Sequence, residues 1–121
     1  MPMEQDSSFG VERSRRGEAV VVTPEGEIDL ATMDAVRDEL MAARGEAQRV
    51  VLDLRRVEFL DSCGLRLIVE AQRDADQEGW TFVVVRAREP VQRLLDVAGL
   101  SPRLTLVDDP SEAEGDPGGP A

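Results

Sequence analysis

Short apolar runs alternate with segments of helical periodicity along most of this chain, and no other feature limits the possible folds as strongly. The apolar runs lie at residues 19–22, 50–54, 82–85 and 104–107. Between them, apolar residues recur about every three or four positions, which predicts amphipathic helices that end at Gly45, near Gly79 and at Gly99. Helices that alternate with strands imply right-handed crossover connections, so the pattern predicts an α/β domain with a mostly parallel sheet.

The beginning of the chain predicts an antiparallel addition to this sheet. Residues 9–13 are expected to form an edge strand, residues 15–17 a turn, and residues 19–22 the returning strand of a hairpin. That strand is expected to end at Pro24, because proline removes a donor from the ladder, and residues 26–29 are expected to form a bend. The predicted fold class is therefore α/β, with a mixed, mostly parallel sheet, an N-terminal antiparallel hairpin and alternating helices.

Composition predicts one folded domain with a tail at each end. The chain has 121 residues, of which 41% are hydrophobic, enough for a single packed core. Residues 1–8 are polar and are expected to be flexible. Residues 108–121 contain five acidic residues, no basic residue, three prolines and three glycines, and such a segment cannot offset its ordering entropy by apolar burial. We predict a domain over residues 9–107, followed by an acidic, disordered tail over residues 108–121.

The charge and the missing residue types exclude several classes of function. The formal net charge of −11 argues against binding to phosphate backbones, and the aromatic content of 3% argues against a base-stacking platform. The chain has no His and no Lys, and all 14 basic residues are Arg, so it lacks an imidazole base and a phosphate-loop lysine. The single cysteine, Cys63, cannot form an internal disulfide or a metal site with a second Cys or a His. We therefore expect neither an enzyme nor a nucleic-acid-binding protein.

No segment predicts insertion into a membrane or export from the cell. The first residues lack a basic stretch followed by an apolar run, which an export signal requires. No apolar stretch approaches the ~18 residues that a membrane span needs. Together with the single thiol, these features lead us to expect a cytoplasmic protein without membrane partners.

The turn Asp61-Ser62-Cys63-Gly64 is the most informative stretch for function. It joins a strand end to a helix start, where unpaired N–H groups and the helix dipole favour negative charge. One interpretation is an ordinary helix cap, and the other is a site for an anion carried on the Ser62 hydroxyl. Gly64 would allow another backbone to approach closely. A nucleophilic Ser62 or Cys63 is disfavoured, because no histidine or lysine is present to act as its base.

Four stretches resemble one family when they are taken together. They are Gly-Glu-Ile-Asp at 26–29, Val-Val-Leu-Asp-Leu at 50–54, Phe-Leu-Asp-Ser-Cys-Gly-Leu at 59–65, and Val-Gln-Arg-Leu-Leu-Asp-Val-Ala-Gly-Leu at 91–100. Their order and spacing over residues 9–107 resemble the bacterial anti-sigma factor antagonists of the STAS (sulfate transporter and anti-sigma factor antagonist) domain family. The resemblance implies that Ser62, directly after the turn aspartate, is phosphorylated by a partner anti-sigma factor that is an ATP-dependent serine kinase.

The resemblance also implies a partner-switching function in transcription regulation. The unphosphorylated chain would capture the anti-sigma factor and so release a sigma factor. Phosphorylation of Ser62 would end that complex, and a serine phosphatase would reset the chain. The chain itself would need no cofactor, since ATP and Mg²⁺ would belong to the kinase. The environment of the phosphorylated serine and the partner contacts would come from Gly26, Glu27 and Asp29 in the bend, and from Asp61, Cys63 and Gly64 in the turn.

Two departures from the family and two alternatives accompany this hypothesis. Many relatives carry Ser or Thr where this chain has Cys63, and the helix that usually ends the domain is expected to be short or absent, because residues 111–121 lack apolar periodicity. The first alternative is a STAS adapter or scaffold subunit without a phosphorylation cycle. The second alternative is a response-regulator receiver with Asp53 as phosphate acceptor. It is disfavoured because this chain lacks the acidic pair and the lysine that such a receiver needs. Asp53 is instead predicted to orient a turn or pair with Arg at the strand end.

Overall fold

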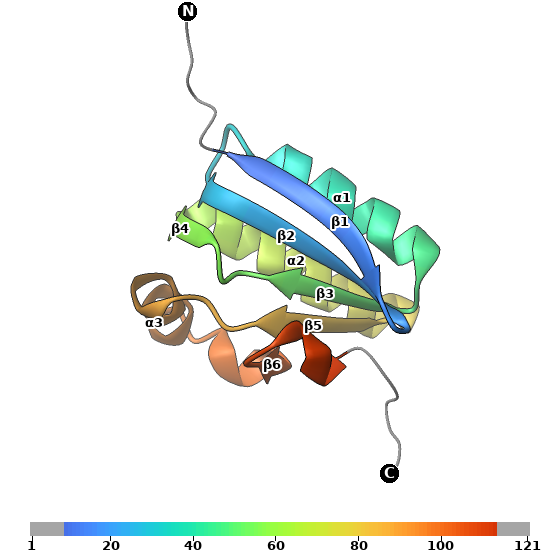
Figure 1. Cartoon of the computed structure of the whole chain (residues 1–121). Coiled ribbons are helices and arrows are strands. Elements are labelled where there is room, and N and C mark those ends of the chain that lie inside the picture. Colours follow the sequence, from blue (N-terminus) through green and yellow to red (C-terminus); the bar gives the residue numbers. More distant parts are fainter. Residues whose placement is uncertain (1–8, 114–121) are drawn as a thin grey trace, which may run out of the picture.

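A mixed six-stranded sheet with three α-helices forms the structure, a computed structural model that describes residues 9–113 (Figure 1). The strands are β1 (Gly10–Arg16), β2 (Ala19–Ile28), β3 (Arg49–Asp53), β4 (Val57–Leu60), β5 (Thr81–Val85) and β6 (Leu106–Val107). The α-helices are α1 (Met33–Glu46), α2 (Ser62–Glu78) and α3 (Glu89–Val97), and two short 3-10 turns, η2 (Ser101–Arg103) and η3 (Pro110–Ala113), follow. The predicted properties of residues 1–8 and 114–121 fall outside the described residues.

The sheet has the topology that the alternating pattern predicts. Its strand order is β1-β2-β3-β5-β6, and β4 pairs with β2 beside this path. Only β1 and β2 are antiparallel, and the pairs β2–β3, β2–β4, β3–β5 and β5–β6 are all parallel. The predicted fold class is confirmed, including the N-terminal hairpin. Strand β4 is an addition, since residues 57–60 were not among the predicted apolar strands.

Strand β2 does not end at Pro24, so that prediction was wrong. The strand pairs with β3 through residues 19–22 and with β4 through residues 26–28. Pro24 lies where β2 changes from one parallel partner to the other, and neither β3 nor β4 pairs with it. The ladder therefore tolerates the missing N–H at that position. The expected bend becomes a register shift at Gly26, whose φ of 103° needs the conformational freedom of glycine.

The first helix is displaced from its predicted limits at both ends. It begins at Met33 rather than at Leu30, and it continues through Gly45 to Glu46. The sequence predicted this helix from the apolar spacing of Leu30, Met33, Val36, Leu40 and Met41. Its buried face in the structure consists of Val36, Leu40 and Ala43. Leu30 lies in the turn before the helix and is 75% exposed. The second helix, by contrast, ends at Gly79 as predicted, with that glycine in the left-handed region at φ 80°.

The two faces of the sheet are covered very differently. Helices α1 and α2 lie behind the sheet in Figure 1 and enclose the main core, which includes Val20, Val22, Val50, Leu52, Phe82 and Val84. The opposite face buries a smaller set, Ala19, Val21, Val51, Val83, Val85 and Ala113. Valine-rich strands with both faces buried explain why these runs read as continuously apolar in the sequence.

The folded domain extends past residue 107, where the sequence predicted its end. Turn η3 places Pro110 and Ala113 in buried positions, with Ala113 against the smaller core. The turn is held by Asp109, whose carboxylate accepts a hydrogen bond from the Ser111 backbone N–H at 2.9 Å. That bond, the Ser111 side chain and the nearby Arg55 guanidinium lower the pKa of Asp109 from its ordinary value. Within the described residues, this short turn is all that follows β6.

Candidate functional site

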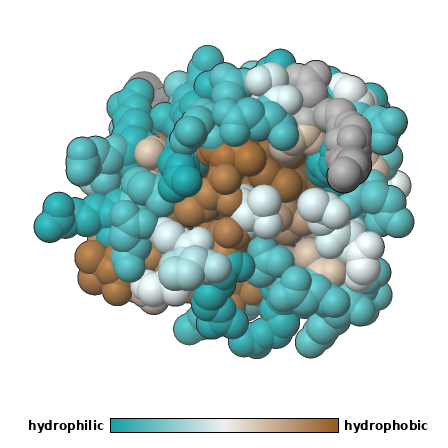
Figure 2. All heavy atoms as spheres, turned by 90° about the horizontal axis from the view of Figure 1, so that it is seen from below, coloured by the Kyte–Doolittle hydropathy of each residue, from teal (hydrophilic) through white to brown (hydrophobic). Residues whose placement is uncertain are grey.

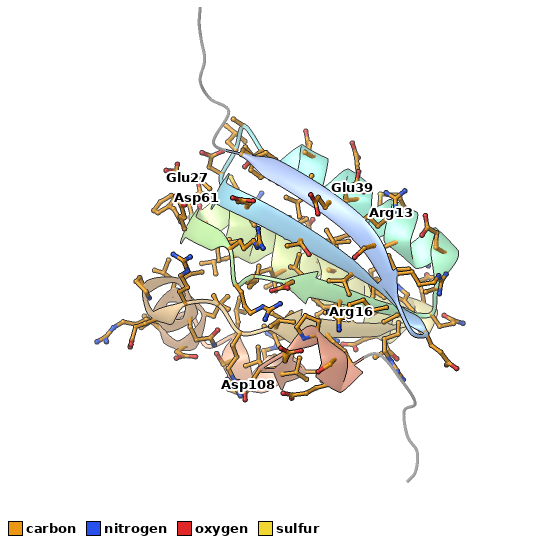
Figure 3. All side chains as sticks on the ribbon, viewed as in Figure 1. Arg13, Arg16, Glu27, Glu39, Asp61 and Asp108 are labelled. Atoms are coloured by element: carbon orange, nitrogen blue, oxygen red, sulfur yellow. The ribbon has the colours of Figure 1, made fainter. Side chains whose placement is uncertain are left out.

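The carboxyl ends of β2 and β4 bring the two predicted acidic elements to one edge of the sheet. Ile28 and Leu60 are paired in the parallel ladder, and Asp29 and Asp61 are the residues that directly follow them. The Asp61 N–H donates to the Ile28 carbonyl oxygen at 3.3 Å, which ties the two turns together. Figure 3 shows the side chains of Glu27 and Asp61 at this same end of the sheet. The structure therefore brings together stretches that are about thirty residues apart in the sequence.

Asp61 is the N-cap of α2. Its Oδ1 accepts hydrogen bonds from the backbone N–H groups of Cys63 at 2.8 Å and Gly64 at 3.3 Å. Such a cap satisfies donors that a helix start otherwise leaves unpaired, and it typically contributes about 1 kcal/mol. The cap interpretation of the turn is therefore confirmed for Asp61. It does not involve the side chain of Ser62.

Ser62 is the first residue of α2 and is exposed to solvent. Its hydroxyl makes no hydrogen bond among the residues that the structure describes, so it is available to an incoming molecule. Cys63, the next residue, is half-buried. The sequence left open whether this turn is a helix cap or a site for an anion on the Ser62 hydroxyl. In the structure Asp61 caps the helix, and the adjacent hydroxyl stays unbonded.

The bend after β2 is fixed by its own hydrogen bonds. The carboxylate of Asp29 accepts from the backbone N–H groups of Ala31 at 3.0 Å and Thr32 at 3.2 Å. The Thr32 hydroxyl donates to the Glu27 carbonyl oxygen at 2.7 Å. At the start of the bend, the buried Gly26 donates its N–H to the Arg56 carbonyl oxygen at 3.1 Å. These hydrogen bonds therefore hold Asp29 in place at this edge of the sheet.

Gly64 has a packing role that sequence reasoning missed. A Cβ at this position would lie 2.2 Å from Leu60 Cδ1 and 3.3 Å from Ile28 Cγ2. The start of α2 therefore sits directly on the paired ends of β2 and β4, which a side chain would prevent. We had expected Gly64 to admit a partner's backbone, and that contact stays a prediction.

Asp53 pairs with arginine, as the sequence predicted. Its exposed fraction is 4%, and its carboxylate accepts from Arg55 Nε at 3.0 Å and Arg55 Nη2 at 2.9 Å. The backbone N–H of Arg55 donates to the same carboxylate at 3.0 Å. The hydrogen bond to Asp53 raises the pKa of Arg55 above its ordinary value. This pair stabilises the turn between β3 and β4, away from the serine.

The sequence did not reveal the exposed apolar side chains near the serine turn. Among the described residues, five large apolar side chains are exposed, namely Leu30, Met41, Phe59, Leu94 and Val97. Leu30 follows β2, Phe59 is on β4, and the last two are on α3, which contacts β4. Figure 2 shows hydrophobic surface at the left end of the molecule, where Figure 1 places α3 and β4. A run such as Phe59-Leu60 looks uniformly apolar in the sequence, so only the fold identifies its exposed member.

The described part of the chain has neither a metal-binding cluster nor a membrane-spanning helix. No group of three or more His, Cys, Asp or Glu side chains there could hold a metal ion. No helix of residues 9–113 is both long and apolar enough to cross a membrane.

Solved structures with the same architecture define the class of protein. An anti-sigma factor antagonist from Mycobacterium paratuberculosis superposes with a TM-score of 0.79 at 28% identity, covering 92% of this chain and 95% of that one. The unphosphorylated form of SpoIIAA, also an anti-sigma factor antagonist, shares the fold, with a TM-score of 0.63 at 19% identity over 86% of this chain and 91% of its own. The small α/β architecture of this chain is thus known from solved structures.

The chain belongs to the STAS domain family, whose family model matches residues 11–113. It is 32% identical over 100 residues to the anti-sigma F factor antagonist of Paenibacillus polymyxa, covering 81% of this chain and 86% of the relative. It is 30% identical over 90 residues to an anti-sigma-B factor antagonist of Staphylococcus epidermidis, covering 74% and 82%. The resemblance drawn from the four sequence stretches is confirmed at the level of the family.

Proposed function

We propose that this chain is an anti-sigma factor antagonist that binds an anti-sigma factor kinase and is switched off by phosphorylation of Ser62. The observation that carries the proposal is the exposed, unbonded hydroxyl of Ser62 at the start of α2, in a chain whose relatives are anti-sigma factor antagonists. In the unphosphorylated state the chain occupies the anti-sigma factor and leaves a sigma factor free.

The chemistry of the switch is divided between the chain and its partners. Ser62 Oγ attacks the γ-phosphorus of ATP, the bond from that phosphorus to the bridging oxygen breaks, and ADP leaves. The proton of the hydroxyl passes to a base on the kinase, which also binds the ATP and Mg²⁺. A serine phosphatase then hydrolyses the phosphoserine with water. This chain acts as a cytoplasmic binding switch that supplies the acceptor hydroxyl and the docking surface.

The charges around Ser62 explain why phosphorylation would end the complex. Glu27, Asp29 and Asp61 make no ion pair among the described residues, so the surface is already acidic. A phosphate adds about −1.5 to −2 charges at pH 7. A partner surface that fits the neutral hydroxyl would have to desolvate this extra charge without a matching cation, at a cost of several kcal/mol.

The exposed apolar side chains near the turn support a docking surface at the same end of the molecule. Because β2, β4 and β5 run in parallel through the sheet, their carboxyl ends lie at one edge, with Leu30, Phe59 and α3 close to that edge. Large exposed apolar residues at this edge fit a partner surface with an apolar centre. Hydrogen exchange with the anti-sigma factor bound should show protection of residues 26–30 and 59–66. Protection confined to residues 108–113 would contradict this surface.

Mass spectrometry of the intact chain provides the direct test. Wild type, Ser62→Ala and Thr32→Ala are each mixed with ATP, Mg²⁺ and a purified anti-sigma factor kinase from the same bacterium. The proposal requires one phosphate on wild type and on Thr32→Ala, and none on Ser62→Ala. Stable binding to the kinase without any phosphate transfer would favour the alternative, a STAS adapter without a phosphorylation cycle.

A further inference from the structure

An unpaired arginine lies one helical turn after the candidate phosphorylation site. Arg66 is exposed, and it makes no hydrogen bond or ion pair within the described part of the chain. Of the arginines on the described α-helices, Arg37 pairs with Asp34 and Glu70 and Arg44 pairs with Asp74, whereas Arg66, Arg73 and Arg93 make no such pair among the described residues. Arg66 is the one of these unpaired arginines that lies within one helical turn of Ser62, so its guanidinium is available to a group carried on that residue.

Helix geometry directs Arg66 toward Ser62. Both residues belong to α2, four positions apart, so their side chains lie on the same face of the helix. Side chains on an α-helix also lean toward its N-terminus, which tilts Arg66 back over the first turn. An anion that precedes a cation by four residues is the favourable order for such a pair.

The groups around Ser62 and Arg66 offer no other partner to Arg66 or to a phosphate on Ser62. The acid four residues after Arg66 is Glu70, and it already accepts from Arg37 of α1 at 2.9 Å. At the helix start, the N–H groups of Cys63 and Gly64 are occupied by the Asp61 carboxylate. A phosphate on Ser62 would therefore find two backbone donors already used and a carboxylate beside it. A guanidinium is well suited to this position, because it binds phosphate through paired N–H donors.

We propose that Arg66 is a positioning residue that pairs with the phosphate of phosphorylated Ser62 and holds it on the surface of α2. The inference rests on the proposed function in one respect, namely that Ser62 carries the phosphate. The pair stabilises the dianionic phosphate against the carboxylate of Asp61. It also keeps the new charge at the docking end of the molecule, where it opposes the partner.

The test does not depend on the kinase, because phosphoserine can be placed at position 62 by genetic code expansion. The second ionisation of the phosphate is then followed by ³¹P NMR in the full chain with wild-type Arg66, and in Arg66→Gln, Arg66→Lys and Arg73→Gln. Arg73 is the matched control, since it is also exposed on α2 without a partner among the described residues, but lies three turns away from Ser62.

The pairing predicts that Arg66→Gln raises the second pKa of the phosphoserine by about 0.2 to 0.4, the equivalent of one exposed helical ion pair. Arg73→Gln should leave this pKa unchanged, and Arg66→Lys should restore part of the difference. Added salt should reduce the difference, as expected for exposed charges. Equal phosphate titrations of the wild-type and Arg66→Gln chains would overturn the inference. That result would not affect the proposed function, which is decided by transfer from the kinase to Ser62.

Discussion

The starts of α1 and α2 both follow an aspartate at the end of a strand, and they differ in the hydroxyl that they leave exposed. Each follows the end of a parallel strand, and each is preceded by an aspartate, Asp29 or Asp61, at the same edge of the sheet. Asp61 is itself the N-cap of α2, and the hydroxyl of the next residue, Ser62, stays unbonded. At α1, the N-cap residue Thr32 makes no side-chain cap bond, because its hydroxyl is used to hold the bend.

The number of residues between the aspartate and the helix start decides whether the nearby hydroxyl is bonded or accessible. Three residues lie between Asp29 and α1, so the chain forms a closed turn in which Thr32 bonds to Glu27 and Asp29. No residue lies between Asp61 and α2, so the helix begins at once and Ser62 faces solvent. A phosphate would have to break hydrogen bonds at Thr32, whereas at Ser62 it would break none.

The largest expected effect is on partner binding, and it comes from Ser62, whose hydroxyl is the unbonded one of the two. Ser62→Asp should lower affinity for the anti-sigma factor by about 100-fold or more, since ~1.4 kcal/mol is tenfold and several kcal/mol are at stake. Ser62→Ala should bind even with ATP present, because it cannot be phosphorylated. Calorimetry measures both affinities, with circular dichroism as the check that the fold is kept. Equal affinities of wild type, Ser62→Ala and Ser62→Asp would remove the switch and leave a plain adapter.

The same substitution should have opposite effects on the two helices. Gly64→Ala should lower the free energy of unfolding by about 1 to 3 kcal/mol, because its Cβ would collide with Leu60. Gly45→Ala should raise it by about 0.5 to 1 kcal/mol, since no atom lies within 4 Å of the added carbon and alanine favours the helix. Urea denaturation of both variants measures the contrast. A stable Gly64→Ala would show that α2 can move away from β4.

A third comparison is between two exposed apolar side chains, Phe59 on β4 near the serine turn and Met41 on α1. Phe59→Gln should weaken binding to the anti-sigma factor about tenfold, an ordinary loss for one apolar contact at an interface. Met41→Gln is the control, because Met41 is 63% exposed against 46% for Phe59 but lies on α1, beside the groove between α1 and α2. Surface plasmon resonance with the immobilised kinase compares them. Losses of similar size at both positions would argue against a docking surface confined to the serine end.

The smallest expected effect concerns the cap itself. Asp61→Ala should lower the free energy of unfolding by about 1 kcal/mol, because the N–H groups of Cys63 and Gly64 lose their acceptor. Asp61→Asn should retain most of this stability, since asparagine is an equally good cap, and it removes the charge beside Ser62. Thermal unfolding followed by circular dichroism distinguishes the two. If both variants were equally destabilised, the charge of Asp61 rather than its hydrogen bonds would be what stabilises the start of α2.

Local signals in the sequence determined most of the fold class and part of the site. The run at 50–54, apolar except for Asp53, predicts a strand buried on both faces, and Asp61 and Gly79 mark the two ends of α2. Asp53 followed closely by Arg55 predicts the ion pair at the end of β3. These features depend on residues that are neighbours in the chain, so their physical causes, namely capping, periodicity and short-range pairing, are visible without the tertiary structure.

The tertiary structure decided everything that depends on segments meeting from different parts of the chain. Pro24 is accepted within β2 because the strand changes its partner there, from β3 to β4, and neither partner is adjacent in sequence. Gly64 is required because Leu60 and Ile28 meet beneath it, and Leu30 is exposed because α1 starts three residues later. Sequence alone showed a serine at a helix start. The pairing of β2 with β4 is what brings that serine turn to the same edge of the sheet as Asp29.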